Sequence, residues 1–365
     1  MNVCIIGDSL TSLSLAKNLI NKNIKVFVYC DKKNKSQYSS RTIGISKSNF
    51  DFFNNEVLKL NNKIAQKIKQ IEIYSDNSNG KKILNFKNSK KPLFLMLKND
   101  EIYKILEKNL RKNKLFKKIF IKNNLFYKNI NKNKKFDLII NCDYRNIISK
   151  IFFYERINKN YYSFAYTTVI KHKKIKNFKA TQIFTKNGPI AFLPISNFET
   201  SIVFSIKNDK LFLSKVELKK LIQEYNKNYK IKNFGKIEKF NLNFSILRNY
   251  YYKDVMMFGD SLHKIHPLAG QGFNMTLRDM KILSNIIQER MDLGLQFDQS
   301  IYQEFEAKTK HFNFIFSSGI DFIYEFFKLD NKYKNGYSSK LLKFLGKNKL
   351  FNDAVLKYAN QGLVI

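Results

Sequence analysis

The sequence predicts an α/β fold with three parts: a domain built around a parallel sheet, an inserted domain with an antiparallel sheet, and a helical C-terminal region. Three observations support this prediction. An apolar strand, an amphipathic helix and a second apolar strand follow one another in residues 3–29, which is the pattern of a βαβ unit. Residues 161–206 contain alternating apolar and polar segments, as antiparallel strands do. A long stretch of helical periodicity closes the chain.

The other elements are expected from periodicity and from turn residues. In chain order they are a helical stretch from about 50 that gives way to a strand before 75, extended segments in 83–97 around Pro92, a helix from Asp100, strands within 117–140, the antiparallel strands of 161–206, a helix near 214–228, a buried strand at 255–259, and helices to the end.

The composition indicates a globular protein and argues against nucleic acid as a partner. Hydrophobic residues make up 44% of the 365 residues, enough for a sizeable core. The formal net charge of +37 comes mostly from lysines scattered along the whole chain, whereas arginine, which reads bases most often, is scarce. Lysine, asparagine, isoleucine and phenylalanine share AT-rich codons, so genome composition is the simplest explanation of the charge. We therefore expect no nucleic-acid partner.

Compartment is predicted from the cysteines and from the first residues. Cys4, Cys30 and Cys142 form no CxxC pair, and an odd, sparse set does not suggest a disulfide framework. The first ten residues have no basic region before their apolar stretch, so we expect no signal peptide. No apolar run approaches the roughly 20 residues that a bilayer-spanning helix needs. The expected location is the cytoplasm.

The turn after the first strand is a weakened dinucleotide-binding turn. It reads Gly-Asp-Ser-Leu-Thr-Ser in residues 7–12, so Gly7 keeps the first glycine of GxGxxG while Ser9 and Ser12 occupy the other two places. An acidic residue is expected at the end of the second strand to hold a ribose. The matching position is Cys30, and Asp31 next to it is either a substitute or a solvated turn residue.

The most informative stretch is residues 255–279, VMMFGDSLHKIHPLAGQGFNMTLRD. A buried strand ends at Gly259-Asp260, a loop rich in small residues follows, and a helix begins near Phe273. A bare loop leading into a helix N-terminus suits a large planar or anionic ligand group.

In this stretch the chain resembles the class A flavoprotein monooxygenases, which share the fold of para-hydroxybenzoate hydroxylase. It is most similar to the ubiquinone-biosynthesis hydroxylases, whose pattern here is close to GDAAHxxHPLAGQGLNLGLRD. Residues 41–46, RTIGIS, resemble the family's RxxALS segment, and residues 184–194, FTKNGPIAFLP, resemble its FTxxGPxAxLP. Residues 341–363 resemble its C-terminal helices.

The resemblance implies a Rossmann-like FAD-binding domain in a discontinuous arrangement. By this likeness we assign residues 1–75, 98–160 and 250–285 to the FAD-binding domain, 76–97 and 161–249 to the substrate domain, and 286–365 to the C-terminal helical region.

The resemblance also implies the residues that hold the cofactor. Asp260 matches the aspartate that holds the FAD ribityl chain, and Arg41 matches an arginine that reaches FAD. The loop Pro267, Leu268, Ala269 and Gly270 matches the backbone that lies against the isoalloxazine ring. The full set of expected cofactor residues is Gly7, Ser9, Ser12, Asp31, Arg41, Asp143, Gly259, Asp260, Pro267, Gly270, Gly272, Phe273 and Asn274.

A substrate pocket is expected between this loop and the sheet of residues 161–206. Phe184, Phe192 and Pro194 are plausible neighbours, or ordinary sheet core, and His266 is a possible substrate contact. His263 and His266 have no acidic or cysteine residue nearby that completes a ligand set, so we expect no metal.

One motif departs from the family pattern. The D-G-x-x-S-x-V-R segment reads Asp143-Tyr144 at its start, and a tyrosine would be strained there if the backbone needs φ > 0. Two interpretations of FAD binding remain: FAD binds mainly through Asp260 and residues 267–274, or the chain is a non-catalytic scaffold subunit that has lost FAD. If FAD binds, the chain is either a hydroxylase or another flavin oxidoreductase of this fold, such as a prenyl reductase or halogenase.

The activity that the resemblance implies is aromatic-ring hydroxylation in ubiquinone biosynthesis. In this family NAD(P)H reduces FAD, O2 adds to give a C4a-hydroperoxide, and oxygen passes to a prenylated phenol or quinone precursor. Such a substrate lives in a membrane, so peripheral attachment at the inner membrane or a ubiquinone-synthesis complex is an alternative to a free enzyme. Residues 311–327 are either an interfacial helix or a helix that faces the core. Their spacing places the following residues on one helical face: Phe312, Ile315/Phe316, Gly319/Ile320, Ile323 and Phe326/Phe327.

Overall fold

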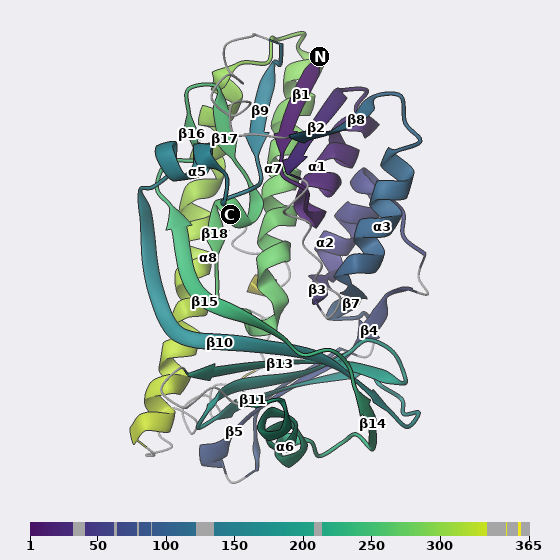
Figure 1. Cartoon of the computed structure of the whole chain (residues 1–365), viewed down its shortest axis with the longest axis vertical. Coiled ribbons are helices and arrows are strands. Elements are labelled where there is room, and N and C mark those ends of the chain that lie inside the picture. Colours follow the sequence, from purple (N-terminus) through teal and green to yellow (C-terminus); the bar gives the residue numbers. More distant parts are fainter. Residues whose placement is uncertain are drawn as a thin grey trace.

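The computed structural model describes residues 1–31, 41–61, 64–78, 80–88, 90–121, 135–207, 214–333, 348 and 357–358. Figure 1 shows a parallel sheet in the upper half of the molecule and a large, mostly antiparallel sheet across the lower half. Two long helices, α7 (Gln271–Asp292) and α8 (Gln299–Tyr333), run down beside them and pack against each other. The C-terminal resemblance in 341–363 falls almost wholly outside the described residues.

The parallel sheet confirms the predicted βαβ unit. Its strand order is β16-β17-β9-β1-β2-β8, and every neighbouring pair is parallel except β16 with β17. Central strand β1 is apolar and buried from Val3 to Ile6, as expected for a strand covered on both faces. The strands are β1 (Asn2–Ile6), β2 (Lys25–Asp31), β8 (Phe116–Ile121), β9 (Leu138–Asn141), β16 (Tyr251–Tyr252) and β17 (Val255–Met257).

Three helices flank the strands of this unit. Helix α1 (Leu10–Asn21) contacts both α3 (Asn99–Leu110) and α7. Helix α3 starts close to the predicted Asp100 and buries Ile102, Leu106 and Leu110 on one face. The short helix α5 (Ile147–Phe152) follows β9.

The large sheet has the order β18-β15-β10-β13-β12-β11-β5-β6, with β14 paired to β10. All the pairs are antiparallel except β11 with β5. Residues 70–75, which the sequence places with the first domain, form β5 of this sheet, and the domain boundaries stay a prediction. The strands are β5 (Gln70–Ser75), β6 (Lys82–Lys87), β10 (Arg156–His172), β11 (Lys179–Thr185), β12 (Gly188–Pro194), β13 (Glu199–Lys207), β14 (Ile231–Phe234), β15 (Glu238–Leu247) and β18 (His263–Lys264).

The two faces of the large sheet have different covers. Helix α6 (Lys215–Tyr225) packs Leu218 and Ile222 into one apolar cluster, and its capping box joins Ser214 to Glu217. The inner side of α8 and Leu268 contribute to a second cluster, which includes Phe184 and Phe244. This second cluster lies on the side of the sheet that meets the loop singled out by the sequence.

A three-stranded antiparallel sheet connects the two units. Its order is β3 (Thr42–Ser46), β7 (Phe94–Lys98), β4 (Gln66–Ile68). The helix expected from residue 50 is shorter than predicted: α2 (Lys47–Phe52) passes into a π-helical turn at Phe53–Val57. The carboxamide oxygen of Asn54 accepts a hydrogen bond from the Leu60 N–H at 3.0 Å, which holds the chain out of the helix. The described residues also include short 3₁₀ turns at Asp76–Ser78, Gly259–Ser261 and Leu268–Gly270.

Helix α8 has apolar side chains on two sides. Its inner side chains Phe316, Ile320, Tyr324 and Phe327 are buried. The expected single face is therefore partly wrong, because Ile315 and Ile323 point outward with about half of their area exposed. The exposed apolar side chains of α8 are Phe314, Ile315, Phe322, Ile323 and Leu329. Within the described residues, no helix is long and apolar enough to cross a membrane.

Candidate functional site: a nucleotide-type edge facing an apolar cluster

The first element of the site is the turn between β1 and α1. Gly7 has φ +117°, and its N–H donates to the Tyr29 carbonyl at 2.8 Å, which ties the turn to β2. A Cβ at position 7 would lie 3.2 Å from the Cβ of Asp143. Only glycine combines this backbone conformation with so close an approach. The turn and Asp143 therefore lie side by side at the carboxyl edge of the parallel sheet.

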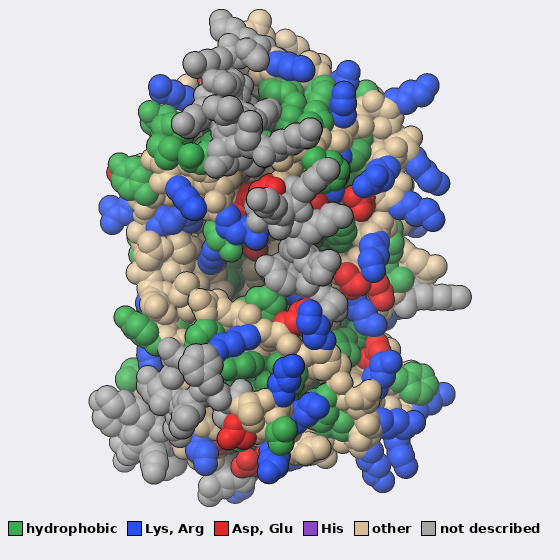
Figure 2. Space-filling model, viewed as in Figure 1, with side chains coloured by type: hydrophobic (Ala, Val, Ile, Leu, Met, Phe, Trp, Pro, Cys, Tyr) green, Lys and Arg blue, Asp and Glu red, His purple; other side chains and the backbone are tan. Residues whose placement is uncertain are grey.

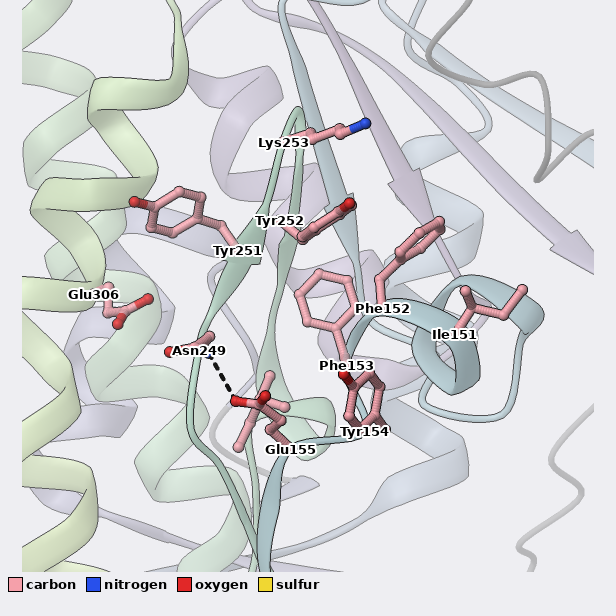
Figure 3. Close-up of a pocket in the computed structure, with 11 residues that line it drawn as sticks. Ile151, Phe152, Phe153, Tyr154, Glu155, Asn249, Tyr251, Tyr252, Lys253 and Glu306 are labelled. Carbon is pink, nitrogen blue, oxygen red and sulfur yellow. Dashed lines mark hydrogen bonds between the residues drawn. The ribbon is translucent and has the colours of Figure 1, made fainter.

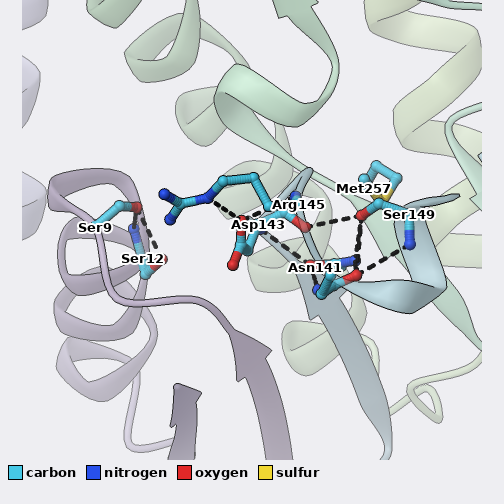
Figure 4. A network of polar contacts seen from close by, with 8 residues as sticks. Ser9, Ser12, Asn141, Asp143, Arg145, Ser149 and Met257 are labelled. Carbon is cyan, nitrogen blue, oxygen red and sulfur yellow. Dashed lines mark hydrogen bonds and ion pairs between the residues drawn. The ribbon is translucent and has the colours of Figure 1, made fainter. Parts of the chain in front are cut away.

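The two serines of this turn contact each other (Figure 4). Ser9 is the N-cap of α1, and its hydroxyl oxygen accepts from the Ser12 N–H at 3.2 Å. The two hydroxyl oxygens lie 2.9 Å apart. Serine at both glycine positions thus keeps the helix start intact, because a serine N-cap stabilises the exposed N–H groups of a first turn. The N-terminus of α1 keeps the positive end of its helix dipole at this edge.

Asp8 turns away from the edge into a buried ionic cluster that the sequence does not predict. Its carboxylate accepts from the Tyr103 hydroxyl at 2.6 Å and from the Lys118 ammonium at 2.9 Å. Lys118 also donates to Glu107 at 2.9 Å. These two carboxylates raise the pKa of Lys118 above its ordinary value, in spite of burial, which acts in the opposite direction. The cluster fixes the second residue of the turn against β8 and α3.

Asp143 is held in a polar network at the start of α5 (Figure 4). Its carboxylate accepts from the backbone N–H and the Nε of Arg145, at 3.0 and 3.1 Å. Its own N–H donates to the Asn141 side chain at 3.0 Å, and the Ser149 hydroxyl donates to its carbonyl at 2.8 Å. The carboxylate is therefore positioned beside Gly7 by contacts from its own loop.

The strain expected at Tyr144 does not arise. The described non-glycine residues with positive φ are Asn23, Tyr162 and Lys253, so Tyr144 has an ordinary backbone conformation. Its ring lies under the ammonium of Lys264, which is 3.0 Å from the ring centroid. Burial lowers the pKa of Lys264 to about 8. A tyrosine at this glycine position thus bridges to strand β18 without strain.

The second element of the site is the end of strand β17. Gly259 has φ +68°, and a Cβ there would lie only 2.6 Å from the Thr11 methyl group, so the strand end packs directly on helix α1. The next residue, Asp260, lies 4.0 Å from the Arg41 guanidinium. Both side chains are a little under half exposed. Two residues that the sequence assigns to the cofactor thus meet, although they are far apart in the chain.

The third element is the start of helix α7. Gly270 has φ +65°, and a Cβ there would lie 3.3 Å from the Gly44 backbone nitrogen. Asn274 is fully buried, and its Nδ2 donates to the Gly44 carbonyl at 2.7 Å. Its Oδ1 accepts from the Ser46 N–H and from the Asn49 side chain, at 2.8 and 2.9 Å. The Asn274 side chain therefore ties the loop to strand β3.

The remaining loop residues differ in where their side chains lie. A Cβ at Gly272 would meet nothing within 4 Å, so open space lies beside the first turn of α7. Phe273 is buried in the core of the parallel-sheet unit. Leu268 is buried in the apolar cluster of the large sheet, and Pro267 is half-buried. The side chain of Ala269 lies outside the described residues.

Asp31 ends strand β2, next to Cys30. Cys30 is buried, and burial raises the pKa of its thiol to about 11, so it is a neutral core residue. Asp31 is half-buried at the strand end. It is thus the residue of this pair that can present a carboxylate at the sheet edge, and its ribose-binding role stays a prediction.

The two loop histidines have separate surroundings. His263 is buried, and its Nε2 lies 2.8 Å from the carboxylate of Asp279, which also accepts from Asn313 at 3.0 Å. His263 therefore joins β18 to α7 and α8. His266 is 1% exposed and stacks on Tyr324, with ring centroids 4.3 Å apart. Among the described residues, no group of three or more His, Cys, Asp or Glu side chains is arranged to hold a metal ion.

His266 should make the protein lose stability in acid. Burial lowers its pKa to about 3, whereas an unfolded histidine has a pKa of about 6.5. Below pH 6.5 the unfolded state binds the proton first, so stability falls as the pH decreases toward 3. We expect this residue alone to remove about 2 kcal/mol between pH 7 and pH 5. Denaturant unfolding of the wild type and His266→Phe at both pH values measures it, and equal pH dependence in the two proteins would contradict the prediction.

The predicted substrate-side residues lie on different faces of the large sheet. Phe184 stacks on Phe327 of α8, with ring centroids 3.6 Å apart, in the cluster that contains Leu268. Phe192 lies in the other cluster, against Tyr229 under helix α6. Pro194 follows Phe192 by two residues in β12 and so shares its face. The observed register explains the separation: Phe192 pairs with Thr181, which is three residues from Phe184 in β11 and therefore points to the opposite face.

A separate cavity of about 570 Å³ lies between α5, the end of β15, β16 and α8 (Figure 3). The Phe152 and Tyr252 rings stack at 4.8 Å on its wall. It is lined by Ile151, Phe152, Phe153, Tyr154, Glu155, Leu247, Asn249, Tyr251, Tyr252, Lys253 and Glu306. No residue that the sequence assigns to the cofactor or substrate lines it.

The site is thus the edge where three elements from distant parts of the chain meet. Figure 2 shows the molecule hollowed between its upper and lower units. The carboxylates, one arginine and the glycines described above lie along the upper unit, and the apolar cluster with Phe184 lies on the lower one. Sequence reasoning missed Tyr161 and Tyr324 beside His266, and Lys264 beside Tyr144. The spacing of Tyr324 from Phe316, Ile320 and Phe327 was the available signal for the first of these.

Comparison with known families gives a match over more than half of the chain. Residues 157–355 match the family described as squalene epoxidase.

Several similar curated proteins are ubiquinone hydroxylases, and others are named FAD-dependent monooxygenases. The mitochondrial ubiquinone biosynthesis monooxygenase COQ6 of Dictyostelium discoideum is 26% identical over 213 residues, which is 48% of this chain and 42% of that protein. The 3-demethoxyubiquinol 3-hydroxylase of Escherichia coli is 28% identical over 150 residues, 39% of this chain and 38% of that protein. The chain spans about two fifths of the length of these relatives. The resemblance to ubiquinone-biosynthesis hydroxylases is confirmed.

Solved structures confirm the predicted α/β fold. The p-nitrophenol 4-monooxygenase PnpA of Pseudomonas putida has a TM-score of 0.78 at 12% identity, covering 100% of this chain and 98% of that chain. Klebsiella pneumoniae HpxO, solved with FAD and uric acid, has a TM-score of 0.74 at 11% identity, covering 99% and 96%. At this level of identity the likeness concerns the fold.

Proposed function

Since this chain belongs to the squalene epoxidase family, we propose that it is an FAD-dependent monooxygenase that hydroxylates the ring of a prenylated phenol in ubiquinone biosynthesis. One observation supports the proposal most: the Gly7 turn, the Arg41–Asp260 pair and the start of α7 converge on one edge, beside open space at Gly272. The names of several relatives support the substrate class, since these proteins are ubiquinone hydroxylases.

The residues at this edge fit FAD by their chemistry. The N-terminus of α1 and Arg41 favour a diphosphate, because both present positive charge. Asp260 offers a carboxylate to the hydroxyl groups of a ribityl chain, and Asp31 offers one to a ribose. The start of α7 presents a helix N-terminus and a glycine without a neighbour at its Cβ position. When bound, FAD supplies the redox chemistry, with NAD(P)H as reductant and O2 as oxidant.

The rest of the chain would position the substrate and exclude water. The apolar cluster around Phe184 and Leu268 faces the loop and offers a dry surface for an aromatic ring and a prenyl chain. No nucleophilic side chain is required, because the cofactor performs the oxidation.

Gly272→Ala separates cofactor binding from folding. Since a Cβ at 272 meets nothing within 4 Å, we expect the free energy of unfolding to stay equal or rise by about 0.5–1 kcal/mol, the usual gain of alanine over glycine in a helix. We expect FAD affinity to fall, because the methyl group enters the space that the isoalloxazine ring would fill.

The matched control is Gly270→Ala. Its φ of +65° and its 3.3 Å approach to Gly44 predict a loss of stability without FAD. Denaturant unfolding and FAD titration of both variants test this. If Gly272→Ala binds FAD as tightly as the wild type does, the proposed position of the flavin ring beside the first turn of α7 is wrong.

The proposal also includes attachment to a lipid surface. The exposed apolar side chains of α8, with a net charge of +37, suit the interface of an anionic membrane. We expect Phe322→Ser with Ile323→Ser to reduce co-sedimentation with anionic vesicles. The same change at Phe152 and Tyr252, a stacked and exposed aromatic pair away from α8, is the control. Equal sedimentation of the two double variants would contradict attachment through α8.

The activity is tested with the FAD-loaded protein, a prenylated phenol, NAD(P)H and ¹⁸O₂. Substrate-dependent NAD(P)H oxidation with one labelled oxygen in the product supports the proposal. A folded protein that binds FAD and forms a reduced or halogenated product would be another flavin oxidoreductase of this fold. A folded protein without FAD affinity would be a scaffold subunit.

A further inference from the structure

His266 is a buried polar ring without a hydrogen bond. Its side chain is 1% exposed, and neither ring nitrogen has a hydrogen-bond partner among the described residues. Burial lowers its pKa to about 3, so the ring is neutral at ordinary pH and has one N–H donor and one acceptor nitrogen. Buried polar atoms are nearly always paired, because an unpaired one is unfavourable. A histidine ring without a hydrogen bond, beside a ligand site, suggests that the bound ligand itself supplies the hydrogen-bond partner.

The aromatic walls of this ring differ in how firmly they are held. The Tyr161 ring meets it edge-on at 5.3 Å, and the Tyr161 hydroxyl donates to Asp321 at 2.8 Å. Tyr324 stacks on it at 4.3 Å with an interplanar angle of 25°. Within the part of the chain that the structure describes, the Tyr324 hydroxyl reaches the Ser163 hydroxyl at 3.5 Å, which is a long and weak contact. Tyr161 is therefore a fixed wall and Tyr324 a loosely held cover.

His266 lies at the boundary between the loop and the apolar cluster. Its carbonyl accepts from the Leu268 N–H at 2.7 Å, so its position is fixed relative to the loop. Leu268, Tyr161 and Tyr324 all belong to the cluster that contains Phe184. Tyr324 comes directly after Phe322 and Ile323, the exposed residues of α8. One helix thus presents a cover to His266 on its inner side and an apolar surface on its outer side.

We propose that His266 binds the hydroxyl group of the phenolic substrate ring, which reaches it by displacing Tyr324. This inference rests on the proposed function. His266 would position the substrate by accepting a hydrogen bond, and it would not take the proton as a base. The hydroxyl donates to the free ring nitrogen, and Tyr161 remains as a wall for the substrate ring. The prenyl chain extends along the cluster toward the outer side of α8. His266 thereby selects a phenol over a ring or chain without a hydroxyl group.

The test compares a geranyl-substituted phenol with its methyl ether by calorimetric binding to the full chain, with and without FAD. We expect the wild type to bind the phenol at least about 10-fold more tightly than the ether. His266→Leu should bind both equally, and His266→Gln, which keeps a donor and an acceptor, should restore part of the preference. Tyr324→Phe removes only the weakly paired hydroxyl and should keep the full preference.

Two results would overturn the inference: equal binding of phenol and ether by the wild type, or an unchanged preference in a folded His266→Leu. Its failure is distinguishable from failure of the proposed function. A protein that binds FAD and hydroxylates the phenol, but has no preference for it over the ether, contradicts only the role of His266. A protein that prefers the phenol but never binds FAD contradicts only the monooxygenase.

Discussion

Asp260→Ala is expected to weaken FAD binding by roughly 10- to 100-fold and to leave the fold intact. The Asp260 carboxylate is about half exposed at the sheet edge, next to Arg41, so it supports no core packing. Hydrogen bonds to a charged group contribute about 1.5–3 kcal/mol, which corresponds to this range of affinity. Titration of the apoprotein with FAD, followed by flavin fluorescence, measures the change.

The matched control is Asp254→Ala. Asp254 is an exposed aspartate that immediately precedes strand β17, whereas Asp260 follows that strand. Its replacement should leave FAD affinity unchanged. If both variants bind FAD as the wild type does, Asp260 is not a cofactor residue, and the assignment of this edge to FAD loses its main carboxylate.

Lys118→Met is expected to lower the free energy of unfolding by about 3–5 kcal/mol. The side chains of Lys118 and Asp8 are each only 8% exposed, and Lys118 also pairs with Glu107. Removing the ammonium leaves the buried Asp8 carboxylate without its counter-charge, which costs far more than the loss of a surface ion pair, whereas Glu107 keeps its pair with Arg111 at 3.0 Å. Denaturant unfolding by circular dichroism measures the loss.

Two further variants make this prediction specific. Lys117→Met changes the exposed neighbouring lysine of β8 and should alter stability by less than about 0.5 kcal/mol. Asp8→Asn in the Lys118→Met background should recover part of the loss, because it removes one unpaired charge. Equal stability of the two lysine variants would show that the buried cluster does not anchor the Gly7 turn.

The fold was predictable where residue patterns reflect one local cause. The apolar strands β1 and β2 around α1 require parallel pairing, and that pairing is observed. The stretch 255–279 was informative because two of its glycines are required by close packing: Gly259 packs on Thr11, and Gly270 packs on Gly44. The predicted likeness to flavin monooxygenases rested on this stretch, and the relatives confirm it.

Features that depend on tertiary contacts were not predictable in the same way. The sequence places Asp8 in a ligand turn, whereas its carboxylate is occupied by Lys118, which is distant in the chain. Strain at Tyr144 was expected only if its backbone needed φ > 0, and the observed backbone avoids the left-handed region. Phe192 was expected either beside Phe184 at the substrate pocket or in the sheet core, and it lies on the opposite face of the large sheet from Phe184. The roles of the individual cofactor and substrate residues stay predictions.

FAD binding at the edge formed by the Gly7 turn, the Arg41–Asp260 pair and the start of α7 is measured by the visible absorption spectrum of the protein after gel filtration. The purified full chain is incubated with excess FAD, freed of unbound cofactor, and checked for folding by circular dichroism. We expect the wild type to retain a flavin absorption band and Asp260→Ala to retain a much weaker one. A folded wild-type protein that retains no flavin would contradict the monooxygenase proposal and leave the scaffold interpretation in its place.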